Sequence, residues 1–494
     1  MSTLTAVIPL VPLVVAAIIA AAGWRAVTAW LCPVASLVVI GAGVALAVHV
    51  LDDGAVSALG GLARADALSA FMVIVIGIVA LIATTYGVAY IRTELDQGVT
   101  TTLRARLYGA LMQVFVAAML VAVLADNLGV MWVAVETTTV VTAALVGHRR
   151  TRASLEAAWK YLVLGSVGVA LALMGTVLVY FVSRHAGGDA EHALEWTSLV
   201  ALAPKLDPGA LRLAIGLVVL GYGTKAGLAP MHSWLPDAYS QAPAPVAALM
   251  SGSLSAIAFY ALLRFKVVAD IALGEGYVRG LLIAAALLSL AVAASLMLTQ
   301  RDVNRLIAYS SIEHMGLIAL GAAIGTPLAI AAALLHILGN GLAKSVMFCT
   351  SGELLFGERT TEIARVRGVL ARRPLIGGVA GLSFAALIGM PPFSLFASEL
   401  ALARTGIADG LGWAIAIAFL LMLVIAAAIL VHVLRMLSGD APAESAPAES
   451  APHRTSVIAA SPLIVGLLAA ALLGVSIWPI ERLLHAAAAV LVQQ

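Results

Sequence analysis

The chain has 494 residues, of which 62% are hydrophobic and 11% charged. Soluble globular proteins carry charge on roughly a quarter of their residues, so this composition excludes that class and indicates a polytopic membrane protein. The net charge of +2 gives no reason to expect a nucleic-acid partner. Cys32 and Cys349 lie far apart, and the sequence has no nucleotide-binding or metal-binding motif. We therefore expect neither a cofactor nor a metal site.

Apolar runs of about 20 residues, the length that crosses the hydrocarbon core, recur along the whole chain. The first run has no Lys or Arg before it, so we interpret it as a span and not as a cleaved signal peptide. Unpaired backbone groups are not tolerated in lipid, so every span should be a helix. The fold class is all-α, with about 14 predicted spans at residues 4–22, 27–50, 67–90, 107–125, 128–147, 156–182, 210–230, 244–265, 277–298, 303–324, 327–350, 374–398, 411–436 and 456–478.

Lys and Arg are about twice as frequent in the odd-numbered connections between these spans as in the even-numbered ones, which include the connection with Arg264. Cytoplasmic loops carry an excess of these residues. The odd-numbered connections should therefore face the cytoplasm, and both termini should lie on the opposite side.

Two predicted spans contain an ionisable residue where a charge is costly. Glu136 is in the middle of "NLGVMWVAVETTTVVTAALVG". Apolar sequence continues past Lys225 in "TKAGLAPM", before the polar stretch that holds His232. Glu136 could instead be a packing residue bonded to a hydroxyl, and Lys225 could extend to the membrane surface. We interpret both as parts of an ion-handling site.

A second group of polar residues lies in the tenth to twelfth spans. His336, Asn340 and Lys344 recur at four-residue spacing, so they share one helix face that should point into the protein. A lone histidine is more often a satisfied core residue, but a three-residue polar stripe is harder to explain that way. The other candidates in this group are Glu313, His314 and Glu399.

Two of the predicted spans carry helix-breaking residues. Glycines and Pro230 interrupt the seventh span, and "GMPP" interrupts the twelfth. Breaks five spans apart suggest two inverted repeats of five helices. The predicted parts of the chain are residues 1–106 with three N-terminal helices, 107–268 and 269–437 with one repeat each, 438–456 as a flexible Pro/Ala/Glu/Ser linker, and 457–494 with the last span and tail.

This set of side chains suits the movement of protons. Carboxyl, imidazole and amine groups gain and lose protons when burial and nearby charges shift their pKa values. Two such groups that interact also change each other's affinity for protons.

At this point the sequence resembles a family. The strings "TKAGLAPMHSWLPDAYSQAPAPVAALMSG", "RLIAYSSIEHMGLIALG", "LHILGNGLAKSVMFCTSGEL" and "GMPPFSLFASEL" are similar to those of the antiporter-like proton-translocating membrane subunits of respiratory complex I. The "SSIEHMG" string, with no long lateral helix after the last span, favours the hydrogenase-4 component F branch of group 4 membrane-bound hydrogenases. The resemblance covers residues 66 to 436.

The resemblance implies a non-redox subunit with no catalytic centre of its own. Glu136 and Lys225 would form the Glu–Lys pair of the first half-channel. His336 and Lys344 would lie on the central axis, and Glu399 on the exit side. Its partners would be other membrane subunits and soluble iron–sulfur or nickel–iron subunits, in the inner membrane of a prokaryote.

The sequence departs from the family in the central region. Relatives often have Lys or His in the eighth span, where this chain has only Ser251, Ser253 and Ser255, and some have His where it has Asn340. Serine and asparagine order water but do not titrate. Either conduction there would depend on chains of water, or pumping would be weakened.

Other functions stay open at this stage. The chain could be a subunit of a cation/proton antiporter, with Na⁺ in place of or beside H⁺. It could also be the membrane energy-coupling partner of a soluble protein that captures inorganic carbon. A secondary solute carrier would share the broken helices.

Overall fold

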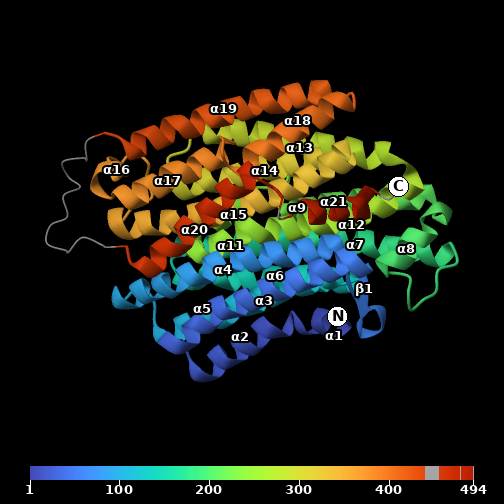
Figure 1. The fold of residues 1–494 in the computed structure, drawn as a ribbon, viewed down its shortest axis with the longest axis horizontal. Helices are drawn as coiled ribbons and strands as arrows, with labels where there is room; N and C mark the ends of the chain where they lie inside the picture. Colours follow the sequence, from blue (N-terminus) through green and yellow to red (C-terminus); the bar gives the residue numbers. More distant parts are fainter. Residues whose placement is uncertain (440–454, 479, 493–494) are drawn as a thin grey trace.

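The computed structural model describes residues 1–439, 455–478 and 480–492. The predicted linker at 438–456 falls almost entirely outside the described residues. Long helices lie side by side along one direction (Figure 1). The first part of the chain comprises α1 (Ser2–Val7), α2 (Leu10–Ala22), α3 (Ala26–Asp53), β1 (Val56–Ala58), η1 (Leu59–Gly61), β2 (Ala63–Ala65) and α4 (Ala67–Asp96).

The helices after α4 form the rest of the bundle. Next come α5 (Thr102–Leu124), α6 (Leu128–Val146), η2 (Gly147–Arg149), α7 (Arg152–His185), α8 (Trp196–Leu202), η3 (Ala203–Lys205), α9 (Pro208–Ala226), α10 (Trp234–Gln241), α11 (Ala244–Leu249), η4 (Met250–Leu254) and α12 (Ser255–Leu273). The last helices are α13 (Glu275–Met297), α14 (Val303–Ile324), α15 (Pro327–Glu358), α16 (Val369–Arg372), α17 (Pro374–Leu387), α18 (Ser394–Ala408), α19 (Gly412–Leu437), α20 (Val457–Val475) and α21 (Glu481–Val492).

The structure confirms the class of polytopic helical membrane protein. Among the described residues, 12 helices are long and apolar enough to cross a membrane. The count of about 14 spans stays a prediction, because α9 is less apolar and α17 is shorter than a regular span. The strands β1 and β2 form a small antiparallel hairpin between α3 and α4 that the sequence did not predict.

Both predicted breaks are present. The helix α9 ends at Gly227, whose φ of 88° is left-handed, and the chain resumes its helical course at Trp234 in α10. The helix α17 ends before Gly389, whose φ is 66°, and α18 begins at Ser394. Glycine adopts such φ values without strain. The division into repeats at 107–268 and 269–437 stays a prediction.

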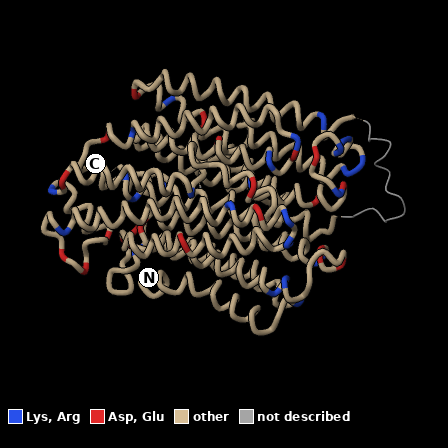
Figure 2. Tube along the Cα trace, turned by 180° about the vertical axis from the view of Figure 1, so that it is seen from behind, with Lys and Arg blue, Asp and Glu red and all other residues tan. Residues whose placement is uncertain are grey.

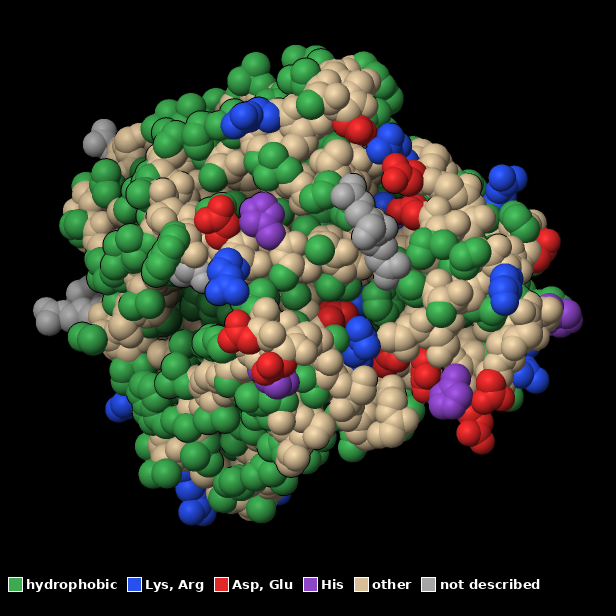
Figure 3. All heavy atoms as spheres, turned by 45° about the vertical axis from the view of Figure 1, so that its right-hand side comes forward, with side chains coloured by type: hydrophobic (Ala, Val, Ile, Leu, Met, Phe, Trp, Pro, Cys, Tyr) green, Lys and Arg blue, Asp and Glu red, His purple; other side chains and the backbone are tan. Residues whose placement is uncertain are grey.

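Charged residues gather at the two ends of the bundle, and only a few lie between them (Figure 2). The helices α1 and α21 lie toward the same end as α8 (Figure 1). On that end, Figure 3 shows acidic, basic and histidine side chains, whereas hydrophobic side chains cover much of the adjoining flank. This distribution suits a bundle whose middle is surrounded by lipid.

The centre of the bundle is formed by three segments that have no lipid-facing side. The most apolar windows of Ala244–Leu273, Val303–Ile324 and Pro327–Glu358 are 100% buried, against 33% for Gly412–Leu437. Polar side chains on such central helices contact protein and not lipid. The predicted polar stripe of the eleventh span lies on one of them, α15.

One expectation about charge is wrong. We placed Arg264 in a connection between spans, but α12 continues to Leu273 and the side chain is buried. Its guanidinium donates two hydrogen bonds to Asp66, at 2.7 and 2.8 Å. Asp66 also caps α4 by accepting a bond from the backbone N–H of Ser69. The carboxylate on a distant helix explains why an arginine is tolerated here.

We predict that Arg264→Met destabilises the chain strongly. The substitution would leave the Asp66 carboxylate buried without its bidentate partner, and the free energy of unfolding should fall by about 3–5 kcal/mol. The measurement is the thermal unfolding midpoint of the purified chain in detergent, followed by intrinsic fluorescence.

Arg365→Met is the matched control, because Arg365 pairs with Glu362 on the surface and such pairs contribute about 1 kcal/mol or less. Adding Asp66→Asn to Arg264→Met should restore much of the stability, since asparagine still caps a helix. Equal midpoints for the Arg264 and Arg365 variants would contradict this account.

Candidate functional site

Many of the predicted site residues fall into two groups, whose side chains are buried except for the half-buried Glu136 and Ser166. The Lys225 cluster consists of Glu136, Thr139, Tyr161, Ser166 and Lys225, from α6, α7 and α9. The His336 cluster consists of His314, His336, Ser398 and Glu399, from α14, α15 and α18. Between them lie Lys344, Glu313 and a set of hydroxyl groups on the central helices.

Lys225 is at the end of the broken helix α9, with an exposed fraction of 0%. Its ammonium donates hydrogen bonds of 2.7 Å to Thr139 Oγ1 and to Tyr161 OH. The ammonium also lies 5.0 Å from the centre of the Tyr161 ring, a cation–π contact. Lys225 therefore does not extend to the membrane surface, and that alternative is wrong.

Glu136 and Lys225 are joined through a hydroxyl group. Thr139 donates to Glu136 Oε2 at 3.2 Å while it accepts from Lys225. Ser166 donates to the other carboxylate oxygen at 3.1 Å. Glu136 is thus bonded to hydroxyls, as the packing interpretation expects, but one of these hydroxyls is also bonded to the lysine.

The break between α9 and α10 fixes the position of this cluster. The carbonyl of Thr224 accepts a hydrogen bond of 2.9 Å from the indole of Trp234, which begins α10. The ring of Trp234 packs on Tyr161 with centroids 4.8 Å apart and on Tyr239 at 5.8 Å. The rings of Trp234 and Tyr239, which we call the aromatic wall, therefore cover the Lys225 cluster on the side of α10.

Lys344 is the second fully buried lysine. Its ammonium donates to the carbonyl of Ile307 at 2.8 Å and to the hydroxyl of Ser310, both on α14. Among the described residues, the hydrogen-bond partners of Lys344 and Lys225 are hydroxyl and carbonyl groups, and no carboxylate forms a salt bridge with either. Both ammonium groups rely on neutral partners, an arrangement in which burial strongly disfavours the charge.

The serines of the eighth span contact neighbouring helices. The hydroxyls of Ser251 and Ser311 are 2.9 Å apart, and those of Ser255 and Tyr239 are also 2.9 Å apart. Ser251 lies in the short π-helix η4, a distortion that is frequent at functional sites. Ser253 instead donates to the carbonyl of Leu249 in the same span. Two of the three serines therefore make hydroxyl contacts with neighbouring helices.

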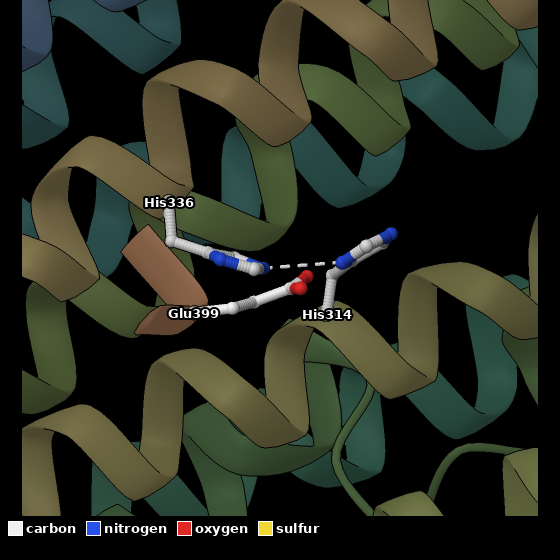
Figure 4. A group of neighbouring side chains, drawn as sticks. All are labelled: His314, His336 and Glu399. Carbon is white, nitrogen blue, oxygen red and sulfur yellow. Dashed lines mark hydrogen bonds between the residues drawn. The ribbon is translucent and has the colours of Figure 1, made fainter. Parts of the chain in front are cut away.

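The His336 cluster brings together three predicted residues. Nδ1 of His314 and Nε2 of His336 are 3.1 Å apart, and Glu399 places its carboxylate beside them (Figure 4). Nδ1 of His336 is 2.9 Å from Ser398 Oγ. The eleventh and twelfth spans therefore meet the tenth at a buried polar centre.

Four of the predicted residues have a buried polar atom without a partner among the residues that the structure describes. These atoms are Glu313 Oε2, Asn340 Oδ1, Nε2 of His314 and Nδ1 of His232. Glu313 lies within electrostatic reach of Lys344 and Glu399. His232 lies in the break after α9 and makes no side-chain bond to either cluster.

The sequence did not reveal one further buried group. Glu94 is fully buried in α4, and Arg149 donates to it at 3.0 Å. His148 approaches the same carboxylate at 3.6 Å. A signal was present, since "GHRR" follows the sixth helix directly and Glu94 ends an apolar run. Spacing alone could not bring these two segments together.

Comparison with known proteins identifies the relatives of this bundle. Residues 125–426 match the family described as NADH:quinone oxidoreductase/Mrp antiporter, TM. The hydrogenase-4 component F homolog of Methylacidiphilum infernorum is 38% identical over 334 residues, which cover 68% of this chain and 70% of that protein. The NADH-quinone oxidoreductase subunit N of Desulforudis audaxviator is 30% identical over 341 residues, which cover 68% of this chain and 64% of that protein.

Solved structures share the fold along nearly the whole chain. A chain of the Mrp complex from Dietzia superposes with a TM-score of 0.85 at 21% identity, covering 100% of this chain and 98% of that one. A chain of respiratory complex I from Thermus thermophilus gives a TM-score of 0.80 at 23% identity, covering 99% of each.

Proposed function

Because the chain belongs to the NADH:quinone oxidoreductase/Mrp antiporter transmembrane family, we propose that it moves protons through the bundle along its two buried clusters. It is an antiporter-like proton-translocating membrane subunit of the complex I and hydrogenase type. Electron transfer would take place in other subunits, and this chain would convert their conformational changes into proton movement.

The observation that carries the proposal is the bridge from Lys225 through Thr139 to Glu136. A hydroxyl can accept a proton from an ammonium on one side and donate its own on the other. A change in the position of α9 would break or restore this bridge and thereby control the transfer.

The central helices offer a continuation of this route. Ser251 and Ser311 link the eighth span to α14, where Ser310 contacts Lys344. Protons would pass along these hydroxyls with water filling the gaps, since serine does not itself titrate. The aromatic wall of Trp234 and Tyr239 separates this segment from the Lys225 cluster and would act as the point of control.

The His336 cluster would complete the route. Glu313 leads from Lys344 to His314 and His336, and Glu399 would release the proton on the exit side. His232 and Asn340 would order water near the breaks. The first cluster belongs to the predicted repeat 107–268, and the second to 269–437.

The assembly follows from the same family membership. The partners would be other membrane subunits and soluble iron–sulfur or nickel–iron subunits. The chain would lie in the inner membrane of a prokaryote with both termini on the non-cytoplasmic side. The basic loops at the end of the bundle that carries α16 support this orientation (Figures 1 and 2).

A second candidate function is a subunit of a cation/proton antiporter. The family description includes the Mrp antiporter, and the fold matches a chain of an Mrp complex. Co-purification of partners with this chain, followed by mass spectrometry, separates the two. Redox subunits would favour the first function, and a set of small membrane subunits with a Na⁺ requirement would favour the second.

We predict that Thr139→Val uncouples proton movement almost as strongly as Glu136→Gln or Lys225→Ala. Valine has the shape of threonine but no hydroxyl, so the bridge is interrupted and the fold is kept. Proton uptake should fall about 100-fold, the lower range for loss of one positioned proton-transfer group. The measurement is dye quenching in liposomes that contain the purified complex, with electron transfer recorded in parallel.

Thr137→Val is the control, because Thr137 is half-buried and donates to the carbonyl of Val133 in its own helix, away from both clusters. Its proton uptake should match that of the unchanged complex. Normal uptake in the Thr139, Glu136 and Lys225 variants, at unchanged rates of electron transfer, would refute the proposed route.

We also predict that Ser251→Ala lowers proton uptake, whereas Ser253→Ala does not. Ser251 bonds to α14, whereas Ser253 donates to Leu249 in its own span and contacts the sulfur of Met119 on α5, away from α14. A loss of about tenfold is expected for Ser251→Ala in the same liposome assay. Equal effects of the two substitutions would show that the eighth span contributes packing and no route.

A further inference from the structure

The His336 cluster contains an arrangement that proton transfer alone does not require. His314, His336 and Glu399 come from three helices, and each offers a ligand atom within 4.8 Å of the other two (Figure 4). The two histidines have exposed fractions of 0% and the glutamate 7%. Two imidazoles and one carboxylate are also the protein ligands of some catalytic zinc sites.

The hydrogen bonds around His336 suit one tautomer of its ring. The hydroxyl of Ser398 lies 2.8 Å from the carbonyl of Leu395, to which it can donate. Its oxygen lies 2.9 Å from Nδ1 of His336 and accepts from that nitrogen in the Nδ1–H tautomer. In this tautomer Nε2 presents a lone pair toward His314. An outer partner that suits one tautomer in this way is typical of metal-binding histidines.

Glu399 lacks the partners that a buried carboxylate needs. In the part of the chain that the structure describes, burial is the only influence on the Glu399 carboxyl, and no ion pair or hydrogen-bond donor offsets it. The Gly389 backbone at the break before α18 lies directly against the carboxylate, where a Cβ would collide with it. The fold thus holds an uncompensated acid against two imidazoles, which is costly unless a cation or proton is shared among them.

We propose that His314, His336 and Glu399 form a binding site for a divalent transition-metal ion of the zinc type. Two Zn–N bonds of about 2.0–2.1 Å at a tetrahedral angle place the nitrogens roughly 3.3 Å apart, close to the 3.1 Å between the histidines. Nitrogen ligands select zinc, cobalt or copper over magnesium and calcium. The sequence predicted no metal site, because the three residues are far apart along the chain.

The proposed site differs from the other acidic and histidine group on the molecule. Asp189, Glu191 and His192 also lie close together, but all three are exposed. His192 bonds instead to Glu195 at 2.8 Å. Exposed acidic groups are common without an ion, so this group carries no site and supplies a control.

A bound ion would occupy the lone pairs that the proposed proton route uses. Such an ion would therefore inhibit proton movement. This consequence rests on the proposed function, whereas the metal site itself does not.

The test is a titration of the purified full-length chain in detergent with Co²⁺, whose visible absorption reports a four- or five-coordinate site, followed by competition with Zn²⁺. We expect one ion per chain. Glu399→Gln and His336→Gln should weaken binding more than about 100-fold, beyond the 10–100-fold expected for the outer partner in Ser398→Ala. His192→Gln should bind as the unchanged chain does.

Several outcomes would overturn the proposal. These are the absence of a visible band at millimolar Co²⁺, a band that survives in both Glu399→Gln and His336→Gln, or a band lost in His192→Gln. Ser398→Ala keeps all three ligands, so it decides the question if the ligand variants do not fold. If the Ser398→Ala variant bound Co²⁺ with the same affinity as the unchanged chain, this result would count against the site. Because the readout is metal binding, a failure here leaves the proton route untouched, and the reverse also holds.

Discussion

An ionised side chain inside a membrane bundle must find polar partners within the protein, because lipid offers none. This constraint explains the distribution of polar residues in the chain. The central segments that lack a lipid-facing side carry Lys344, His314, His336 and the serines of the eighth span, whereas Lys225 lies on α9 and is buried against α6 and α7. Where a full ion pair forms, as between Asp66 and Arg264, it joins two distant helices and has a structural role.

The two buried lysines differ from that pair in a way that bears on function. Lys225 and Lys344 are held by hydroxyl and carbonyl groups, and neither has a carboxylate as its direct partner. A charge compensated in this way is stabilised less than one in a bidentate ion pair. The fold therefore contains two kinds of buried charge. The Asp66–Arg264 ion pair is structural, whereas Lys225 and Lys344 are the groups that we propose take part in proton movement.

Much of this arrangement could be predicted from the sequence, since it depends on local pattern. The four-residue spacing from His336 to Lys344 predicted a buried helix face, and glycine and proline predicted both breaks. The links between helices could not be predicted, because they depend on how distant segments pack. Thr139 as a bridge, Ser398 as the partner of His336, and the burial of Arg264 all belong to this class. The charge count misplaced Arg264 because the sequence alone does not distinguish a buried arginine from one in a loop. The distinction depends on its partner Asp66, which is almost 200 residues away in the chain.

The central claim is that a continuous polar path joins the two clusters through the middle of the bundle. The most direct measurement is a structure of the chain within its complex at a resolution that reveals water. The account predicts ordered waters within hydrogen-bond distance of Glu313 Oε2 and Asn340 Oδ1, joining Lys344 to His314. Dry apolar contacts around these two atoms would contradict it.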